Sequence, residues 1–155
     1  MRQIAVMLGG NLPGSASAFA RALEKFAAAG VGAMRVSPPV SSAAEDCVPG
    51  TPDFLDQAFT GVWAGSPEEL LALCQRIERE AGRPARHSSR ESRILDCDII
   101  LFGDEVIDTP ALTVPHPRAL RRRFVLEPLS RIAPEMRFPG GMTVAEALRA
   151  LDGTA

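Results

Sequence analysis

Two periods of hydrophobic residues alternate along the chain, and each predicts a different kind of element. A short apolar run from Ile4 to Leu8 ends at Gly9-Gly10-Asn11, which is typical of a buried strand closed by a tight turn. Comparable runs of apolar residues, bounded by glycine or polar residues, recur three more times. We therefore expect strands over residues 4–8, 31–36, 54–63 and 95–102.

Between these strands the apolar residues follow helical spacing. From Phe19 to Phe26 they recur at intervals of three and four positions, which places them on one face of a helix. Ser66, Pro67 and Glu69 form the pattern of a capping box with proline at the first helical position. The expected helices cover residues 15–29, 67–81 and 143–151.

The remaining segments are rich in proline, glycine or arginine. Residues 37–52 and 83–93 are predicted to be long loops, of the length at which loops are usually functional or mobile. Gly103-Asp104 suggests a hairpin turn that leads the strand over 95–102 into residues 105–107. Residues 114–117 are expected to be rigid and extended, and 118–129 to form one or two short helices, stopped by Pro128 and Pro134.

The predicted order is β-α-β-β-α-β with a helical tail. This order favours an α+β fold of the ferredoxin-like sandwich type, a mostly antiparallel sheet with helices packed on it. A doubly wound sheet is less favoured because no helix separates the second and third strands. The length of 155 residues suits one domain, so residues 1–155 are expected to form a single unit.

Charge and cysteine content narrow the class of protein. The net charge of −2 gives the molecule no strong attraction for nucleic acid or for an acidic membrane, and no apolar stretch reaches the length of a membrane span. Three widely spaced cysteines without a C-x-x-C pattern argue against a disulfide framework and against a cysteine-based zinc site. We expect a monomeric, cytoplasmic protein that binds neither nucleic acid nor membranes.

Asp96 and Asp98 are the candidate metal ligands. They lie two positions apart on a predicted strand, so both side chains point to one face while Cys97 points to the other. Two close carboxylates repel each other unless a cation lies between them, and this spacing suits Mg²⁺. Two solvated acids at a strand edge are the alternative.

Arginines dominate the basic residues, since 16 of the 17 are Arg. Half of these arginines flank the acid pair in two groups, and Arg offers a planar fork of donors that matches phosphate oxygens. An ordinary solvated surface explains any single one of them. The surrounding pattern favours magnesium-dependent phosphoryl transfer. The two groups are Arg83, Arg86, Arg90 and Arg93, and Arg118, Arg121, Arg122 and Arg123.

Several segments together resemble one enzyme family. The most specific are the strand 95–103, Leu-Asp-Cys-Asp-Ile-Ile-Leu-Phe-Gly, and the segment 112–117, Leu-Thr-Val-Pro-His-Pro. Further segments match in order, and the match covers nearly the whole chain: 8–12, 52–55, 67–71, 76–78 and 123–129. The chain resembles the 6-hydroxymethyl-7,8-dihydropterin pyrophosphokinases of folate biosynthesis. The resemblance implies Mg²⁺-dependent transfer of diphosphate from ATP to the hydroxymethyl group of a reduced pterin, with release of AMP.

The resemblance also implies roles for individual residues on the ATP side. Asp96 and Asp98 would hold two Mg²⁺ ions and, with Arg93 and His116, would form the catalytic set. The implied ATP contacts are Arg83, Ile99, Thr113, His116 and Arg122. From the residues alone, His116 between two prolines is equally well explained by a structural hydrogen bond, and Glu78 by a solvated helix face.

On the acceptor side, the resemblance implies that Phe54 and Phe124 sandwich the pterin ring and that Asp56 reads its polar edge. A flat heterocycle gains from aromatic faces above and below it. From composition alone, ordinary core packing is the better explanation of both phenylalanines.

The sequence departs from the family pattern mainly around the acceptor. The family usually has Asn at the position of Asp56, a Trp in the loop that here reads 89–93, and Ser at the position of Gly10. An ionised carboxylate offers only acceptors, so selectivity could change. Three alternatives follow: a true dihydropterin pyrophosphokinase, a paralogue acting on a different pterin-like alcohol, or a weakly active nucleotide-binding module. The loops over 41–52 and 83–93 are predicted to close over ATP.

Overall fold

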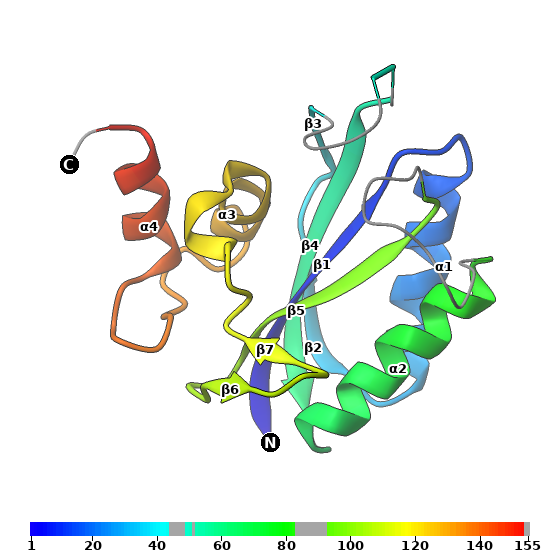
Figure 1. Cartoon of the computed structure of the whole chain (residues 1–155). Coiled ribbons are helices and arrows are strands. Elements are labelled where there is room, and N and C mark those ends of the chain that lie inside the picture. The colour runs from blue at the N-terminus through cyan, green and yellow to red at the C-terminus, as the bar shows by residue number, and fades with distance from the viewer. Residues whose placement is uncertain (44–48, 51, 83–92, 154–155) are drawn as a thin grey trace.

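The central feature of the computed structural model is an antiparallel sheet in which β1 is paired on both sides. The strands run in the order β2–β4–β1–β5, and β3 pairs with the same edge of β4 as β2 (Figure 1). The structure describes residues 1–43, 49–50, 52–82 and 93–153. The strand bounds are β1 Arg2–Gly10, β2 Gly32–Val36, β3 Val40–Ser42, β4 Phe54–Trp63 and β5 Asp96–Phe102.

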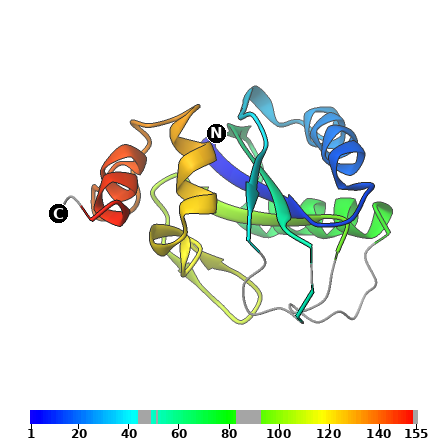
Figure 2. The ribbon, with the colours of Figure 1, turned by 90° about the horizontal axis from the view of Figure 1, so that it is seen from above.

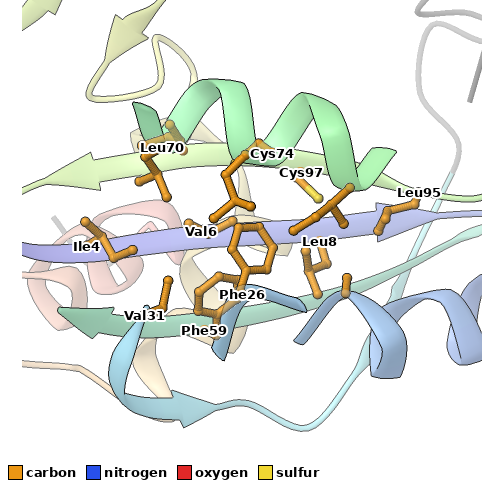
Figure 3. Packing of buried hydrophobic residues seen from close by; sticks show 14 of the residues in the cluster. Ile4, Val6, Leu8, Phe26, Val31, Phe59, Leu70, Cys74, Leu95 and Cys97 are labelled. Atoms are coloured by element: carbon orange, nitrogen blue, oxygen red, sulfur yellow. The ribbon is translucent and has the colours of Figure 1, made fainter. Parts of the chain in front are cut away.

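Two helices, α1 (Ser15–Ala28) and α2 (Pro67–Glu80), cover one face of this sheet. Their apolar stripes meet the alternate residues of β1, and Phe26 of α1 packs on Phe59 of β4 with ring centroids 4.8 Å apart. Figure 3 shows the resulting core, which also takes in Cys74 and Cys97. This β-α-β-β-α-β arrangement confirms the predicted α+β ferredoxin-like sandwich.

The opposite face of the sheet is covered as well. The short helix α3 (Arg123–Ser130) packs there, and α4 (Val144–Leu151) packs against α3 on its far side from the sheet, as seen from above in Figure 2. Ala5 and Met7 of β1 belong to this second core. Because both faces of β1 are buried, its sequence is almost continuously apolar rather than alternating.

The predicted start of α2 is confirmed in detail. The Ser66 hydroxyl accepts the Glu69 N–H at 3.0 Å, and the Glu69 carboxylate accepts the Ser66 N–H at 2.9 Å. Pro67 occupies the first position of the helix, where no N–H is needed. The last helix begins with the same motif, built from Thr143 and Glu146.

The predicted hairpin after Gly103 is wrong. Residues 105–107 do not pair with β5; instead β6 (Ile107–Asp108) pairs with β7 (Thr113–Val114). The segment that returns to β5 is the one ending at His116, whose N–H donates to the Ile100 carbonyl at 3.2 Å. An apolar anchor, the fully buried Val114, explains why this later segment docks against the sheet.

Two other local predictions also need correction. The segment 37–52, expected to be a loop, contains the strand β3, which pairs with β4. Just before β3, the Ser37 hydroxyl accepts the Ala58 N–H at 2.9 Å. Pro128 does not stop a helix but lies inside α3, after the 3₁₀ turn Ala119–Arg121. Pro128 is buried in α3 beside Leu129, and we attribute its place in the helix to packing that outweighs the lost backbone hydrogen bond.

Candidate active site

The polar residues of interest emerge on the sheet face that α3 covers. Met7 on this face pairs with Ala58 in β4 and with Asp98 in β5. Paired residues of antiparallel strands share a face, and so do residues two apart along one strand. The side chains of Phe54, Asp56, Asp96 and Asp98 therefore all lie on the α3 side of the sheet.

Asp96 and Asp98 point to the same face, as the sequence predicted, while Cys97 is buried in the opposite core. Asp98 is exposed, whereas Asp96 is half-buried and forms an ion pair with Arg93, Nε to Oδ2 at 2.9 Å. Within the described ranges no group of three His, Cys, Asp or Glu residues could hold a metal by itself. Mg²⁺ needs only one or two carboxylates when phosphate oxygens and water complete its shell, so this pair fits it.

Arg93 is held between Phe54 and the end of β1. Its guanidinium carbon lies 5.2 Å from the Phe54 ring centroid, a cation–π contact. Asn11 accepts the Arg93 N–H at 2.8 Å through its side chain and donates its own N–H to the Arg93 carbonyl at 2.9 Å. The Asn11 amide also donates to the Pro52 carbonyl at 3.2 Å. Asn11, which sequence reasoning missed as a site residue, thus ties three segments together.

The two glycines before Asn11 do not form the tight turn that the sequence suggested, since they are the last two residues of β1. Gly9 pairs with Asp56 on one side and with Asp96 on the other. At Gly10 a Cβ would lie 2.3 Å from the Ile94 carbonyl oxygen, so only glycine fits there.

Asp56 is 3% exposed and receives a hydrogen bond from the Ser42 hydroxyl, Oγ to Oδ2 at 2.6 Å. Burial raises the pKa of the Asp56 carboxyl to about 6, and the Ser42 hydrogen bond opposes that rise. The carboxyl is therefore mostly ionised at neutral pH and becomes protonated in mild acid.

His116 connects the acid pair to the arginines of the last cluster. Burial lowers the pKa of its imidazole, the Asp98 carboxylate opposes this, and Arg122 and Arg118 lower the pKa further. The Arg118 N–H donates to His116 Nδ1 at 3.4 Å, which leaves the proton of the neutral ring on Nε2. Thr113 and Ile99, which were predicted to contact ATP, lie on β7 and β5. The side chain of Ile99 is buried in the core under α1 and α2, so only its backbone is available for binding.

A cavity of about 420 Å³ opens between β3 and the start of α3. Arg122 and Phe124 line it, and the Arg122 guanidinium carbon lies 5.2 Å from the Phe124 ring centroid. Ser42 lines the same cavity from the other side. An arginine guanidinium therefore stacks on the ring of Phe54 and another on the ring of Phe124. Ser42 adjoins both phenylalanines, since it pairs with Phe54 across β3 and β4 and lines the same cavity as Phe124.

Glu78 was expected on a solvated helix face, but it is part of the support of β5. Its Oε2 accepts the N–H of Cys97 at 2.8 Å, between the two acids. Among the described strands β5 lies at the edge of the sheet, and Glu78 thereby satisfies a donor of an edge strand. In the sequence, only the position of Glu78 near the end of the predicted helix could have pointed to this contact. The contact itself depends on how α2 packs against β5.

The remaining predictions on this site lie partly outside the described residues. Arg83 and the other arginines before Arg93 fall in the range 83–92, and most of the predicted closing loops fall in 44–48, 51 and 83–92. No helix in the described part of the chain is both long and apolar enough to span a membrane.

The comparison with protein families decides where this arrangement belongs. Residues 5–134 match the model of the 7,8-dihydro-6-hydroxymethylpterin-pyrophosphokinase (HPPK) family. The chain belongs to the HPPK family. Every predicted site residue lies within the matched range, including Asp96, Asp98 and His116.

Individual relatives agree with this assignment. A 2-amino-4-hydroxy-6-hydroxymethyldihydropteridine pyrophosphokinase of Synechocystis sp. is 38% identical over 108 residues, which cover 69% of this chain and 55% of the relative. The enzyme of the same name from Pseudomonas aeruginosa is 45% identical over 85 residues, 55% of this chain and 52% of the relative. The chain thus spans about half the length of these curated HPPK relatives.

A solved structure supports the fold. The crystal structure of wild-type HPPK-DHPS from Plasmodium falciparum with pteroate superposes with a TM-score of 0.69, covering 96% of this chain and 42% of that one at 13% sequence identity. At this identity the likeness concerns the fold, which agrees with the HPPK assignment made from the sequence match.

Proposed function

We propose that this chain transfers diphosphate from ATP to the hydroxymethyl group of 6-hydroxymethyl-7,8-dihydropterin and releases AMP, a step of folate biosynthesis. The observation that carries the proposal is the grouping of two acids, an arginine and a histidine around β5. Arg93 pairs with Asp96, and the Asp98 carboxylate acts on the imidazole of His116. Membership of the HPPK family supports this reaction in particular.

On the ATP side, Asp96 and Asp98 would hold Mg²⁺, which when bound neutralises phosphate charge. Two ions remain the expectation. Arg93 and Arg122, each already oriented by stacking on a phenylalanine, would bind phosphate oxygens with their planar donor forks. Neutral His116 would donate its Nε2 proton to the phosphate chain. Phosphoryl transfer through a loose transition state requires positioning and charge stabilisation more than a strong base.

On the acceptor side, Phe54 and Phe124 would flank the pterin ring, and Asp56 would accept hydrogen bonds from its N–H edge. Aromatic faces on both sides of a flat ring exclude water from the reacting hydroxymethyl group. The monomeric state, cytoplasmic location, single domain, and lack of nucleic-acid or membrane binding stay predictions, as does the role of Arg83.

A second candidate is the same transfer to a different pterin-like alcohol. Asp56 stands where the family usually has Asn, and this departure favours the second candidate, because an ionised carboxylate cannot donate the hydrogen bond that an amide can. A weakly active nucleotide-binding module of the same fold is the third alternative.

The test is AMP formation from ATP and Mg²⁺ by the purified protein, with and without 6-hydroxymethyl-7,8-dihydropterin. AMP formation that depends on the pterin supports the proposed reaction. If ATP binds but no AMP appears, the acceptor is wrong, and other ring alcohols should be tested. Failure to bind ATP at all would exclude both transfer reactions.

A further inference from the structure

Ser42 and Asp56 form a built contact between two strands next to the candidate site. In the β3–β4 pairing, Ser42 lies opposite Phe54 and Val40 opposite Asp56. The Ser42 hydroxyl reaches along the pair and donates to Asp56 Oδ2 at 2.6 Å. Asp56 is almost fully buried and Ser42 half-buried, so the contact is shielded from bulk water. Such charge-assisted bonds are short and hold both partners in a fixed orientation.

The second carboxyl oxygen of Asp56 has a different environment. Oδ1 lies above Gly9, where an added Cβ would sit 3.6 Å from it. The carbonyl oxygen of Leu55 lies 4.0 Å from the same Cβ position. Apart from the chain neighbours of Gly9, the described residues place no further heavy atom within 4 Å of it. The hydrogen bond from Ser42 therefore engages Oδ2, while Oδ1 lies over Gly9, a residue that has no side chain of its own.

We propose that Ser42 is a positioning residue for the acceptor substrate: by holding Oδ2 it aims Asp56 Oδ1 over Gly9, where Oδ1 accepts an N–H from the edge of a flat heterocycle. This inference rests on the proposed function, because it concerns the acceptor half of the same site. The ligand class is a flat ring that presents an N–H donor at its edge.

Ser42 also sets the charge of the carboxyl. Burial raises the pKa of Asp56 to about 6, and the Ser42 hydrogen bond keeps it from rising further. Gly9 faces Asp56 from β1, and beyond it Asp96 of β5 is paired with Arg93. On the α3 side the charged groups around the cavity are Arg121, Arg122, Arg123 and Glu127. Loss of the Ser42 hydroxyl should therefore shift the protonation of Asp56 to higher pH.

The experiment compares Ser42→Ala with Ser42→Thr, which keeps a hydroxyl, and with Ser41→Ala, an exposed neighbour on the same strand. The KM for the pterin and kcat are measured across the range about one unit either side of pH 6. For Ser42→Ala we expect the pterin KM to rise about fivefold to tenfold, with kcat and the ATP KM little changed. The pH midpoint of pterin binding should move upward, while Ser42→Thr and Ser41→Ala should resemble the parent protein.

Asp56→Asn provides the second arm. In that background the pH midpoint should vanish and Ser42→Ala should add little, because the two residues act as one unit. The inference would be overturned if Ser42→Ala had the same effect in the parent protein and in Asp56→Asn. It would also be overturned if Ser42→Ala raised the KM for the pterin and the KM for ATP equally.

A carboxyl titration of Asp56 by NMR in the free protein separates this inference from the proposed function. An upward shift in Ser42→Ala supports the pairing even if no pterin-dependent AMP is formed, in which case only the identity of the acceptor fails. No shift overturns the positioning role whatever the activity.

Discussion

Asp56 and Asp96 lie on opposite sides of the same glycine. Gly9 of β1 pairs with Asp56 of β4 and with Asp96 of β5, so the three residues form one row across the sheet. Neighbouring strands lie about 4.8 Å apart, which separates the two Cα atoms by about 10 Å. The proposed metal ligand and the proposed acceptor ligand are thereby held at a fixed distance by backbone pairing, with a residue lacking a side chain between them.

The two adjacent glycines of β1 should respond differently to substitution. For Gly9→Ala the added Cβ meets ordinary contacts, so the free energy of unfolding should change by less than about 1 kcal/mol, while the pterin KM rises. For Gly10→Ala the Cβ would lie 2.3 Å from the Ile94 carbonyl oxygen and 2.4 Å from Ser15 Oγ. The free energy of unfolding of Gly10→Ala should fall by on the order of 1–3 kcal/mol or more. Urea unfolding and pterin titration check both, and equal stability of the two variants would contradict the close contacts described at Gly10.

Asp98→Asn should lower kcat by at least about 100-fold, because it removes a proposed charged ligand for Mg²⁺ next to His116. The exposed Asp98 contributes little to folding, so the melting temperature should stay within a few degrees. Asp108→Asn, at an exposed carboxylate of β6, is the matched control and should keep full activity. AMP formation and Mg²⁺ dependence are the measurements, and unfolding of Asp98→Asn under native conditions would indicate a structural role instead.

Glu78→Ala should destabilise the start of β5. It removes the acceptor for the Cys97 N–H and leaves a buried donor without that bond, at a cost of about 1–3 kcal/mol. Glu78→Gln retains an acceptor oxygen and should lose less. Hydrogen exchange at the Cys97 amide, together with kcat, tests this, with Glu24→Ala on the exposed face of α1 as the control. Unchanged protection of Cys97 in Glu78→Ala would show that the contact is not needed.

Asp56 should make the stability of the protein depend on pH. Its pKa is about 6 in the folded protein against an ordinary value of 3.8, so the folded state binds more protons between these values. The free energy of unfolding therefore falls as pH rises through this window, and the penalty is fully present above the folded pKa. Relative to the parent protein, Asp56→Asn should gain about 1–3 kcal/mol between about pH 4 and about pH 7.5.

Urea unfolding at both pH values measures this difference, and Asp53→Asn, at an exposed neighbouring carboxylate, controls for general charge effects. A difference between Asp56→Asn and the parent that stays constant with pH would mean that the folded protein does not raise the pKa of Asp56.

Several elements could be predicted from interactions between residues that are close together in the sequence. The capping box of Ser66 and Glu69 and the proline at the first helical position specify the start of α2 through bonds within four residues of one another. The apolar run of β4 and the Asp-x-Asp alternation of β5 follow from the two-residue period of a strand. The resemblance on two short motifs also led to the HPPK family, which the match over 5–134 confirms.

Other features depend on partners far away in sequence. Glu78 bonds to Cys97, Asn11 to Arg93, and Ser42 to Asp56, and in each case the partner's position is set by how helices and strands pack. Val114 and His116 dock against β5 in place of a hairpin after Gly103. This outcome depends on which segment buries more apolar surface against the sheet, and a local sequence pattern does not contain that information. The sequence by itself determined the elements of the fold, the family, and the residues that we propose for the chemistry. The register of β1 with β4 and β5 decided that Asp56 and Asp96 flank Gly9, because only strand pairing brings residues so distant along the chain into one row.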